Sequence, residues 1–153
     1  MCSMGEAEGL RRRLIEIPMT SISVYPELFV NGSLFSSVEL TALGDYKMYF
    51  EGVLLSVNSW KSAFESNGEI VYLPKLNKIA NHSGFLRDGR ATRAIDALIR
   101  ATDEPLWYTT RQLTPGVPFF SSVNRNKGIR AAFHQLGDLE KFGYCLKGER
   151  PMF

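Results

Sequence analysis

Basic side chains gather at the start of a predicted helix over residues 88–101, and they are the groups in this chain best suited to bind an anion. The basic residues are Arg87, Arg90 and Arg93, and Thr92 lies among them as a further candidate for contact. The planar guanidinium group of arginine donates two parallel hydrogen bonds to a phosphate, or to the O6 and N7 atoms of guanine. The first residues of a recognition helix reach base edges in the major groove of duplex DNA. The spacing therefore predicts a helix that contacts DNA.

Further basic residues lie on either side of this set. They are Lys75, Lys78, Arg111, Arg125, Lys127 and Arg130. Contacts to phosphate position a protein on DNA without reading its sequence, and long basic side chains suit them. We expect the two lysines to contact phosphates and the four later residues to form a basic wing. A helical hairpin with a solvated basic face is the alternative.

Residues suited to catalysis or metal binding are sparse. The two histidines are His82 and His134, and no Cys or carboxylate lies at metal-ligand spacing around either. The chain has no G-x-S-x-G sequence, phosphate-binding loop or dinucleotide-type glycine pattern. Four carboxylates lie close together between residues 88 and 104, which leaves nuclease chemistry as an alternative, although such groups are usually surface charge. We expect no catalysis, no metal and no cofactor.

Charge is divided unevenly along the 153 residues, whose formal net charge is +2. Residues 1–73 carry five basic and nine acidic groups, a net charge of −4, whereas residues 74–153 carry thirteen and seven, a net charge of +6. Such asymmetry favours an anionic partner for the second part of the chain. A dipolar surface with no partner is the alternative.

The composition, 44% hydrophobic and 22% charged, is typical of a soluble globular protein of about one domain. Cys2 and Cys145 are the only cysteines, which favours a reducing cytoplasm and no structural disulfide. No apolar run is long enough to span a membrane, and the first residues do not form a secretory signal. We expect a cytoplasmic protein with no membrane contact, with residues 1–13 as a flexible lead and residues 14–153 as a single domain.

The first part of the chain predicts short strands followed by a long helix. Alternating apolar residues favour one or two strands after the lead, and Asn31-Gly32 favours a hairpin turn. Ser36 and Glu39 have the spacing of a capping box, and apolar residues then recur at helical spacing. We expect a core helix over residues 38–60.

The second part predicts a helix-turn-helix followed by a strand pair. Residues 69–73 are β-branched and aromatic, Pro74 favours a helix start, and His82-Ser83-Gly84 favours a turn. The expected elements are a strand over 69–73, helices over 74–82 and 88–101, a strand over 106–110, an exposed loop over 121–128 and a helix over 127–142. A short helix, a turn with glycine and a longer helix make this motif.

This order of elements resembles the winged helix-turn-helix family. The run LFSSVELTALGDYKMYFEGVLLSVNSW, followed by GEIVYLPKLNKIANHSG, is similar to winged-helix domains of phage and plasmid replication or regulatory proteins, over about residues 34–112. The resemblance implies a winged-helix fold that binds duplex DNA through the helix over 88–101 and the wing. Together with the short N-terminal strands and the C-terminal helix, this predicts an α+β fold of winged helix-turn-helix type. The segment 103–126 is longer than a simple wing requires. A second frame takes the helix over 127–142 as the recognition helix.

Aromatic residues support a different hypothesis, a small protein-binding module or inhibitor. The chain has more of them than one small core needs: Tyr25, Phe29, Phe35, Trp107, Phe119, Phe120, Phe142 and Phe153. An exposed patch of such side chains would bind a protein partner or a second copy of the chain. Burial in the core is the simpler alternative. We therefore expect a transcriptional regulator or replication-associated factor that binds duplex DNA, with a protein partner or a homodimer as the alternative.

Overall fold

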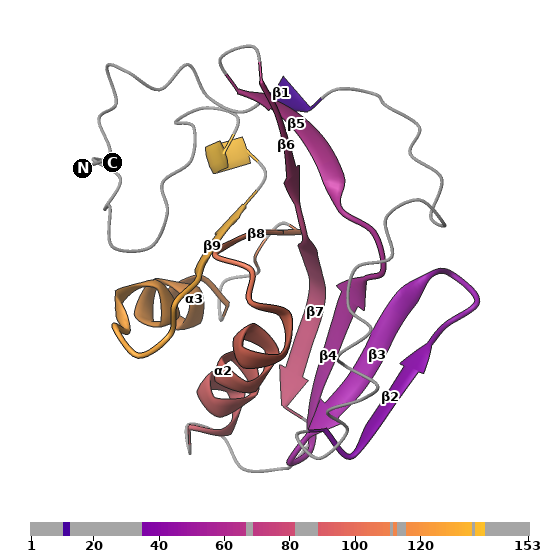
Figure 1. The fold of residues 1–153 in the computed structure, drawn as a ribbon. Coiled ribbons are helices and arrows are strands. Elements are labelled where there is room, and N and C mark those ends of the chain that lie inside the picture. Colours follow the sequence, from indigo (N-terminus) through magenta and orange to yellow (C-terminus); the bar gives the residue numbers. More distant parts are fainter. Residues whose placement is uncertain are drawn as a thin grey trace. The chain divides into compact units, whose positions relative to one another are not determined.

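The protein is a mixed α+β structure (Figure 1). The computed structural model describes residues 11–12, 35–66, 69–81, 89–110, 112, 116–135 and 137–139. The chain divides into two compact units, and each is described by itself. Unit 1 comprises residues 1–16, 61–75 and 104–153, and unit 2 comprises residues 17–60 and 76–103. Among the described residues, no helix is both long and apolar enough to cross a membrane.

Unit 2 is built on an antiparallel sheet whose strands follow the order β2-β3-β4-β7 (Figure 1). The strands are β2 (Ser37–Leu40), β3 (Asp45–Phe50), β4 (Val53–Asn58) and β7 (Lys75–Asn81), the last beginning in unit 1. Buried side chains alternate along β3 at Tyr46 and Met48, which is the period of a strand. Strand β3 therefore has one face in the core of unit 2.

The β3–β4 connection is a two-residue hairpin turn. Phe50 pairs with Val53, and the residues between them, Glu51 and Gly52, have φ values of 47° and 84°. Two consecutive positive φ values define the type I′ turn, whose twist matches that of the flanking strands. Gly52 adopts this backbone without steric cost, whereas Glu51 is a non-glycine residue held in the left-handed region.

A polar clasp joins three strands of this sheet. The register of β7 on β4 shifts between Ser56 and Val57, which leaves Asn77 as the extra residue. Its Nδ2 donates hydrogen bonds to Oδ1 of Asp45 (3.0 Å) and Oδ1 of Asn58 (2.6 Å). Because buried amides require partners, this arrangement satisfies Asn58, which is itself buried.

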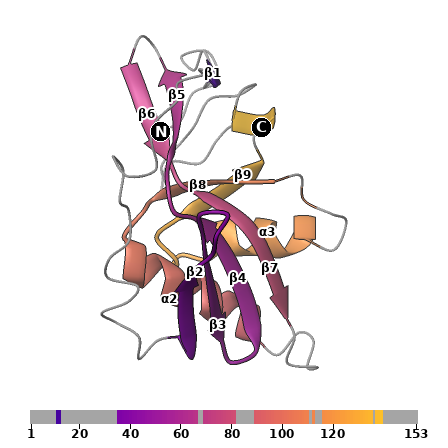
Figure 2. The same ribbon diagram turned by 90° about the vertical axis from the view of Figure 1, so that its right-hand side faces the viewer.

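Helix α2 (Arg90–Thr102) packs against β4 (Figure 2). Its buried residues recur at helical spacing: Ala94, Ile95, Ala97, Leu98, Ile99 and Ala101. The helix ends where Asp103 turns to a φ of 52° and donates its N–H to the carbonyl of Ile99 (2.7 Å). The predicted helix over 88–101 is confirmed from Arg90 onward, and Asp88 lies outside the described residues.

The predicted core helix over 38–60 is wrong, because this segment forms β2, β3 and β4. So many of its residues are apolar that they fit a helical period and a strand period alike. Gly44 and Gly52 both have positive φ values, at 83° and 84°, and lie at the two chain reversals. The two glycines at these turns therefore divide the segment into three strands.

The predicted helix over 74–82 is also wrong, because residues 75–81 form strand β7. Pairing with β4 places Leu55 opposite Ile79 and Leu54 opposite Ala80. This long-range pairing overrides a local pattern that only weakly favours a helix. A helix-turn-helix over residues 74–101 is therefore not formed.

Unit 1 contains a three-stranded antiparallel sheet and a parallel strand pair connected by a helix (Figure 1). Its elements are β1 (Arg11–Arg12), β5 (Ser62–Ser66), β6 (Glu69–Leu73), β8 (Leu106–Thr109), α3 (Gly116–Arg125) and β9 (Ala132–Gln135). The predictions of strands over 69–73 and 106–110 are confirmed. The strands predicted between Leu14 and Tyr25 and the Asn31-Gly32 hairpin lie outside the described residues.

Two predictions for the C-terminal part need correction. The exposed loop over 121–128 is wrong for its first five residues, which belong to α3, and the helix over 127–142 contains strand β9. Ala131, Ala132 and Phe133 are all buried. A strand of a parallel pair is covered on both faces, so such a run carries no alternation to identify it.

Aromatic side chains form much of the core of unit 1. The ring of Trp107 stacks on Phe133 with centroids 5.8 Å apart, and Phe120 contacts the same ring at 5.6 Å. A second cluster consists of Phe64, Leu73, Leu106, Tyr108, Ala132 and Leu139. The two clusters lie on alternate positions of β8, which fixes the strand from both sides.

Candidate nucleic-acid interface

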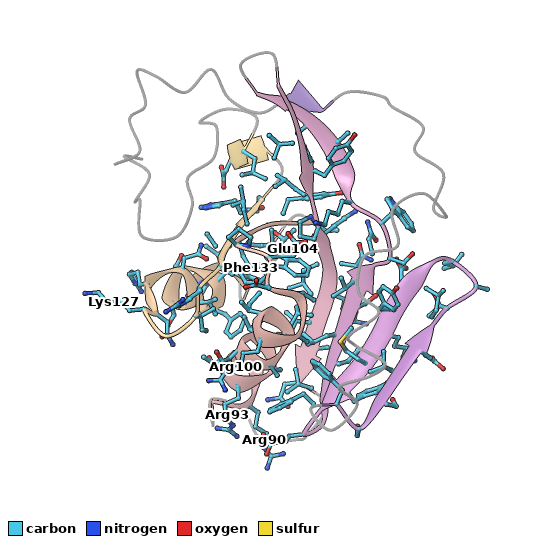
Figure 3. The ribbon with its side chains drawn as sticks, viewed as in Figure 1. Arg90, Arg93, Arg100, Glu104, Lys127 and Phe133 are labelled. Atoms are coloured by element: carbon cyan, nitrogen blue, oxygen red, sulfur yellow. The ribbon has the colours of Figure 1, made fainter. Side chains whose placement is uncertain are left out.

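Three arginines lie along α2 in unit 2 (Figure 3). The side chains of Arg93 and Arg100 are 52% and 74% exposed, and Arg90 is half-buried. Arg93 and Arg100 are seven residues apart, which places them on one face of the helix. Arg90, Thr92 and Arg93 thus occupy the first turn, as predicted. Arg100 was missed, although the seven-residue spacing from Arg93 could have identified it.

Each arginine of this stripe has a partner within unit 2. Arg93 donates from Nε (3.3 Å) and Nη2 (3.2 Å) to Oε2 of Glu51, and Arg90 donates from Nη1 to the carbonyl oxygen of Glu51 (3.3 Å). Nε of Arg100 lies 3.0 Å from Oδ2 of Asp96. Exposed ion pairs contribute only about 0–1 kcal/mol, so another anion can replace these carboxylates.

The N-terminal end of α2 adds to this positive region. Gly89 is the N-cap residue, it makes no side-chain capping hydrogen bond, and the first turn contains no acidic residue. Backbone N–H groups at a helix start attract anions, because the helix dipole is positive there. The φ of Gly89 is 84°, a backbone conformation that favours glycine, and a Cβ at this position would lie 3.2 Å from Nη1 of Arg93, so the arginine side chain would have to shift slightly.

Lys78 is exposed on β7. In the sheet register it lies opposite Ser56 of β4, and Ser56 lies opposite Lys47 of β3. Its predicted position on a helix that precedes the recognition helix is wrong, because that segment is a strand. Lys75 is half-buried in unit 1, with Nζ 5.8 Å from the centroid of the Tyr108 ring. This cation–π contact gives Lys75 a structural role.

A basic turn follows α3 in unit 1. Arg125 ends the helix, and Lys127 (Figure 3) and Arg130 are exposed in the turn that follows. Oδ1 of Asn126 accepts a hydrogen bond from the N–H of Gly128 (2.9 Å), which shapes this turn. Three predicted basic residues are therefore close in one segment. Arg87 and Arg111 lie outside the described residues.

Asn124 is a structural residue rather than a contact in a flexible loop. Its Nδ2 donates to the carbonyl oxygen of Phe133 (2.9 Å), and its Oδ1 accepts from the N–H of Phe133 (2.8 Å). The side-chain amide thus satisfies both main-chain groups of a strand residue, as a neighbouring strand would. This double hydrogen bond ties α3 to β9.

The titratable groups of unit 1 include His134, which is half-buried on β9. Burial lowers the pKa of His134 below its ordinary value, and the nearby carboxylate of Asp138 opposes this shift only in part. Elsewhere in this unit, the hydroxyl groups of Ser62 and Tyr108 share a hydrogen bond, and Lys61 forms an ion pair with Glu104.

We expect the stability of the protein to fall as the pH drops below about 6.5. Because the folded-state pKa of His134 is the lower one, the unfolded chain takes up the proton first, and the loss levels off below the folded-state pKa. Urea unfolding at pH 7.5 and pH 5.5 measures this loss. The variant His134→Gln should lose less stability over the same interval. An equal loss in the variant would contradict this role of His134.

The aromatic residues do not form the predicted exposed patch in the part of the chain that the structure describes. Phe35, Trp107 and Phe120 are buried, and Phe119 is half-buried. The other four candidates, Tyr25, Phe29, Phe142 and Phe153, lie outside the described residues. The simpler alternative, burial in the core, is therefore correct for Phe35, Trp107 and Phe120.

Comparison with protein-family models, curated proteins and solved structures gave no significant match to this chain. No comparison therefore bears on the winged-helix resemblance, and the segments 38–60 and 74–82, two helices of the order on which it rested, form strands. Among the described residues, no three or more His, Cys, Asp and Glu side chains are grouped so that they could hold a metal ion.

Proposed function

We propose that the protein is a non-catalytic duplex-DNA-binding protein whose contact helix is α2. The observation that carries this proposal is the stripe of Arg90, Arg93 and Arg100 on α2. It lies in the part of the sequence that carries the net charge of +6. Arginine is the side chain best matched to phosphate and to the guanine edge.

The proposed contact does not use a helix-turn-helix, since strand β7 stands where the winged-helix resemblance implied a first helix. Instead, a sheet-backed helix offers its outer face to the duplex. The ion pairs of Arg93 with Glu51 and of Arg100 with Asp96 are exposed and exchange for phosphate contacts. The basic turn after α3, which belongs to unit 1, is a separate candidate for phosphate contacts. Selective binding would make the protein a transcriptional regulator, and unselective binding a replication-associated factor.

The test is a fluorescence-polarisation titration of a labelled random duplex at 50 mM and 200 mM salt. The dependence of affinity on salt is steep because each phosphate contact releases counterions. For three phosphate contacts, we expect about a 40-fold loss of affinity over this interval. No measurable binding at 50 mM salt would overturn the proposal.

The N-terminal end of α2, which has glycine at the N-cap position, favours a second candidate function, binding of a small phosphorylated ligand such as a nucleotide. The specific observation is the N-cap Gly89, with no side-chain capping hydrogen bond and no acidic residue in the first turn. Competition distinguishes the candidates. A nucleotide that displaces duplex at equal ionic strength and micromolar concentration would favour the small ligand.

A further inference from the structure

Glu51 contacts Arg90 and Arg93, two of the arginines that bind the ligand in the proposed function. Its carboxylate receives two hydrogen bonds from Arg93, and its carbonyl oxygen receives one from Arg90. Nη2 of Arg93 is 3.2 Å from Oε2, and both side chains are about half exposed. These are the charge-assisted hydrogen bonds that a phosphate oxygen would accept from the same arginine.

The geometry of the β3–β4 turn does not explain why the residue at position 51 is a glutamate. Both central positions of a type I′ turn require positive φ values, which favour Asn, Asp or Gly. Glu51 has a φ of 47°, an uncommon conformation for this residue type. A residue held in such a conformation points to a role outside the turn itself. The carboxylate of Glu51 is paired with the guanidinium group of Arg93, whose positive charge it neutralises.

We propose that the carboxylate of Glu51 occupies the place that a phosphate group of the ligand takes beside Arg93, and that the ligand must displace it. Glu51 is then an intramolecular competitor that weakens binding. This inference rests on the proposed function of α2. Displacement costs little, because the pair is exposed, and the freed carboxylate remains close enough to repel a bound phosphate.

The variants Glu51→Gln and Glu51→Asn test the proposal. Both remove the charge, and asparagine also suits the left-handed position, so the hairpin is preserved in at least one of them. The matched control is Glu39→Gln, which removes an exposed negative charge on β2. Affinity is measured for a labelled duplex and, by competition, for inorganic pyrophosphate.

We expect both Glu51 variants to bind about fivefold more tightly than the wild type, and Glu39→Gln to bind less than about twofold more tightly. In an Arg93→Ala background, the Glu51→Gln change should have little further effect, because the two residues act as a pair. The duplex and pyrophosphate measurements together show whether the displaced anion is a DNA phosphate or a small phosphate.

Two negative outcomes are distinct. If the wild type binds but the Glu51 variants bind no more tightly than Glu39→Gln, the competitor role is wrong and the proposed function stands. If neither the wild type nor the Glu51 variants bind duplex or pyrophosphate at 50 mM salt, the proposed function fails, and this inference fails with it.

Discussion

Replacing Trp107 with alanine is expected to lower the free energy of unfolding by about 3–5 kcal/mol. The side chain is fully buried, its ring stacks on Phe133, and its Nε1 donates a hydrogen bond to the carbonyl oxygen of Glu104 (3.1 Å). Truncation leaves a cavity between α3 and the parallel strands and removes the partner of that carbonyl group. Urea unfolding followed by far-ultraviolet circular dichroism measures the change.

The matched control is Val117→Ala on α3, because Val117 is among the exposed apolar residues. It should change the free energy of unfolding by less than about 0.5 kcal/mol. A loss below about 1 kcal/mol for Trp107→Ala would show that the tryptophan is not part of a closely packed core.

Replacing both Arg90 and Arg93 with alanine is expected to weaken duplex binding by about 1–3 kcal/mol for each arginine that makes a bidentate contact. The slope of affinity against salt should also fall by about one for each phosphate that no longer meets an arginine. Fluorescence polarisation on the same duplex at several salt concentrations measures both quantities. The physical reason is the removal of two guanidinium groups from the first turn of α2.

A control that removes a positive charge outside α2 is Lys47→Ala on β3. It should leave the affinity almost unchanged. Binding that persists at full strength in the Arg90→Ala, Arg93→Ala double variant would exclude α2 as the contact helix. The basic turn at Arg125, Lys127 and Arg130 would then be the next segment to test.

Helix α2 and the strands β6 and β8 could be predicted because their signals are local. In α2, residues such as Ala94, Ile95 and Leu98 are buried at helical spacing within one continuous segment. Strands β6 and β8 are short runs of β-branched and aromatic residues. Such elements show their character without knowledge of what they pack against.

The sheet of unit 2 could not be predicted, because its determinants are turns and long-range pairs. The dipeptide Glu51-Gly52 is not among the strong hairpin signals, although its backbone forms a type I′ turn. Strand β7 depends on its pairing with β4, about twenty residues earlier in the chain. Pro74, which favours a helix start, instead lies just before a strand.

The candidate site was predictable only in its helical half. The positions of Arg90 and Arg93 follow from the helix, but their partner Glu51 is 39 and 42 residues away in sequence. Likewise, nothing local indicates that Asn124 bonds to the main chain of Phe133 rather than to a ligand. Ion pairs and side-chain clasps across a fold depend on tertiary placement.

The two-residue turn between β3 and β4 also bears on the order in which the protein folds. A hairpin closed by so short a connection forms in about 1–10 µs, because little chain entropy is lost when its strands meet. The parallel strands β8 and β9 can pair only after the chain between them, including α3, has crossed back. We therefore expect the β3–β4 hairpin to be structured in the folding transition state and the β8–β9 pair to form late. Mutations in the hairpin would then slow folding, while those around β9 would mainly speed unfolding.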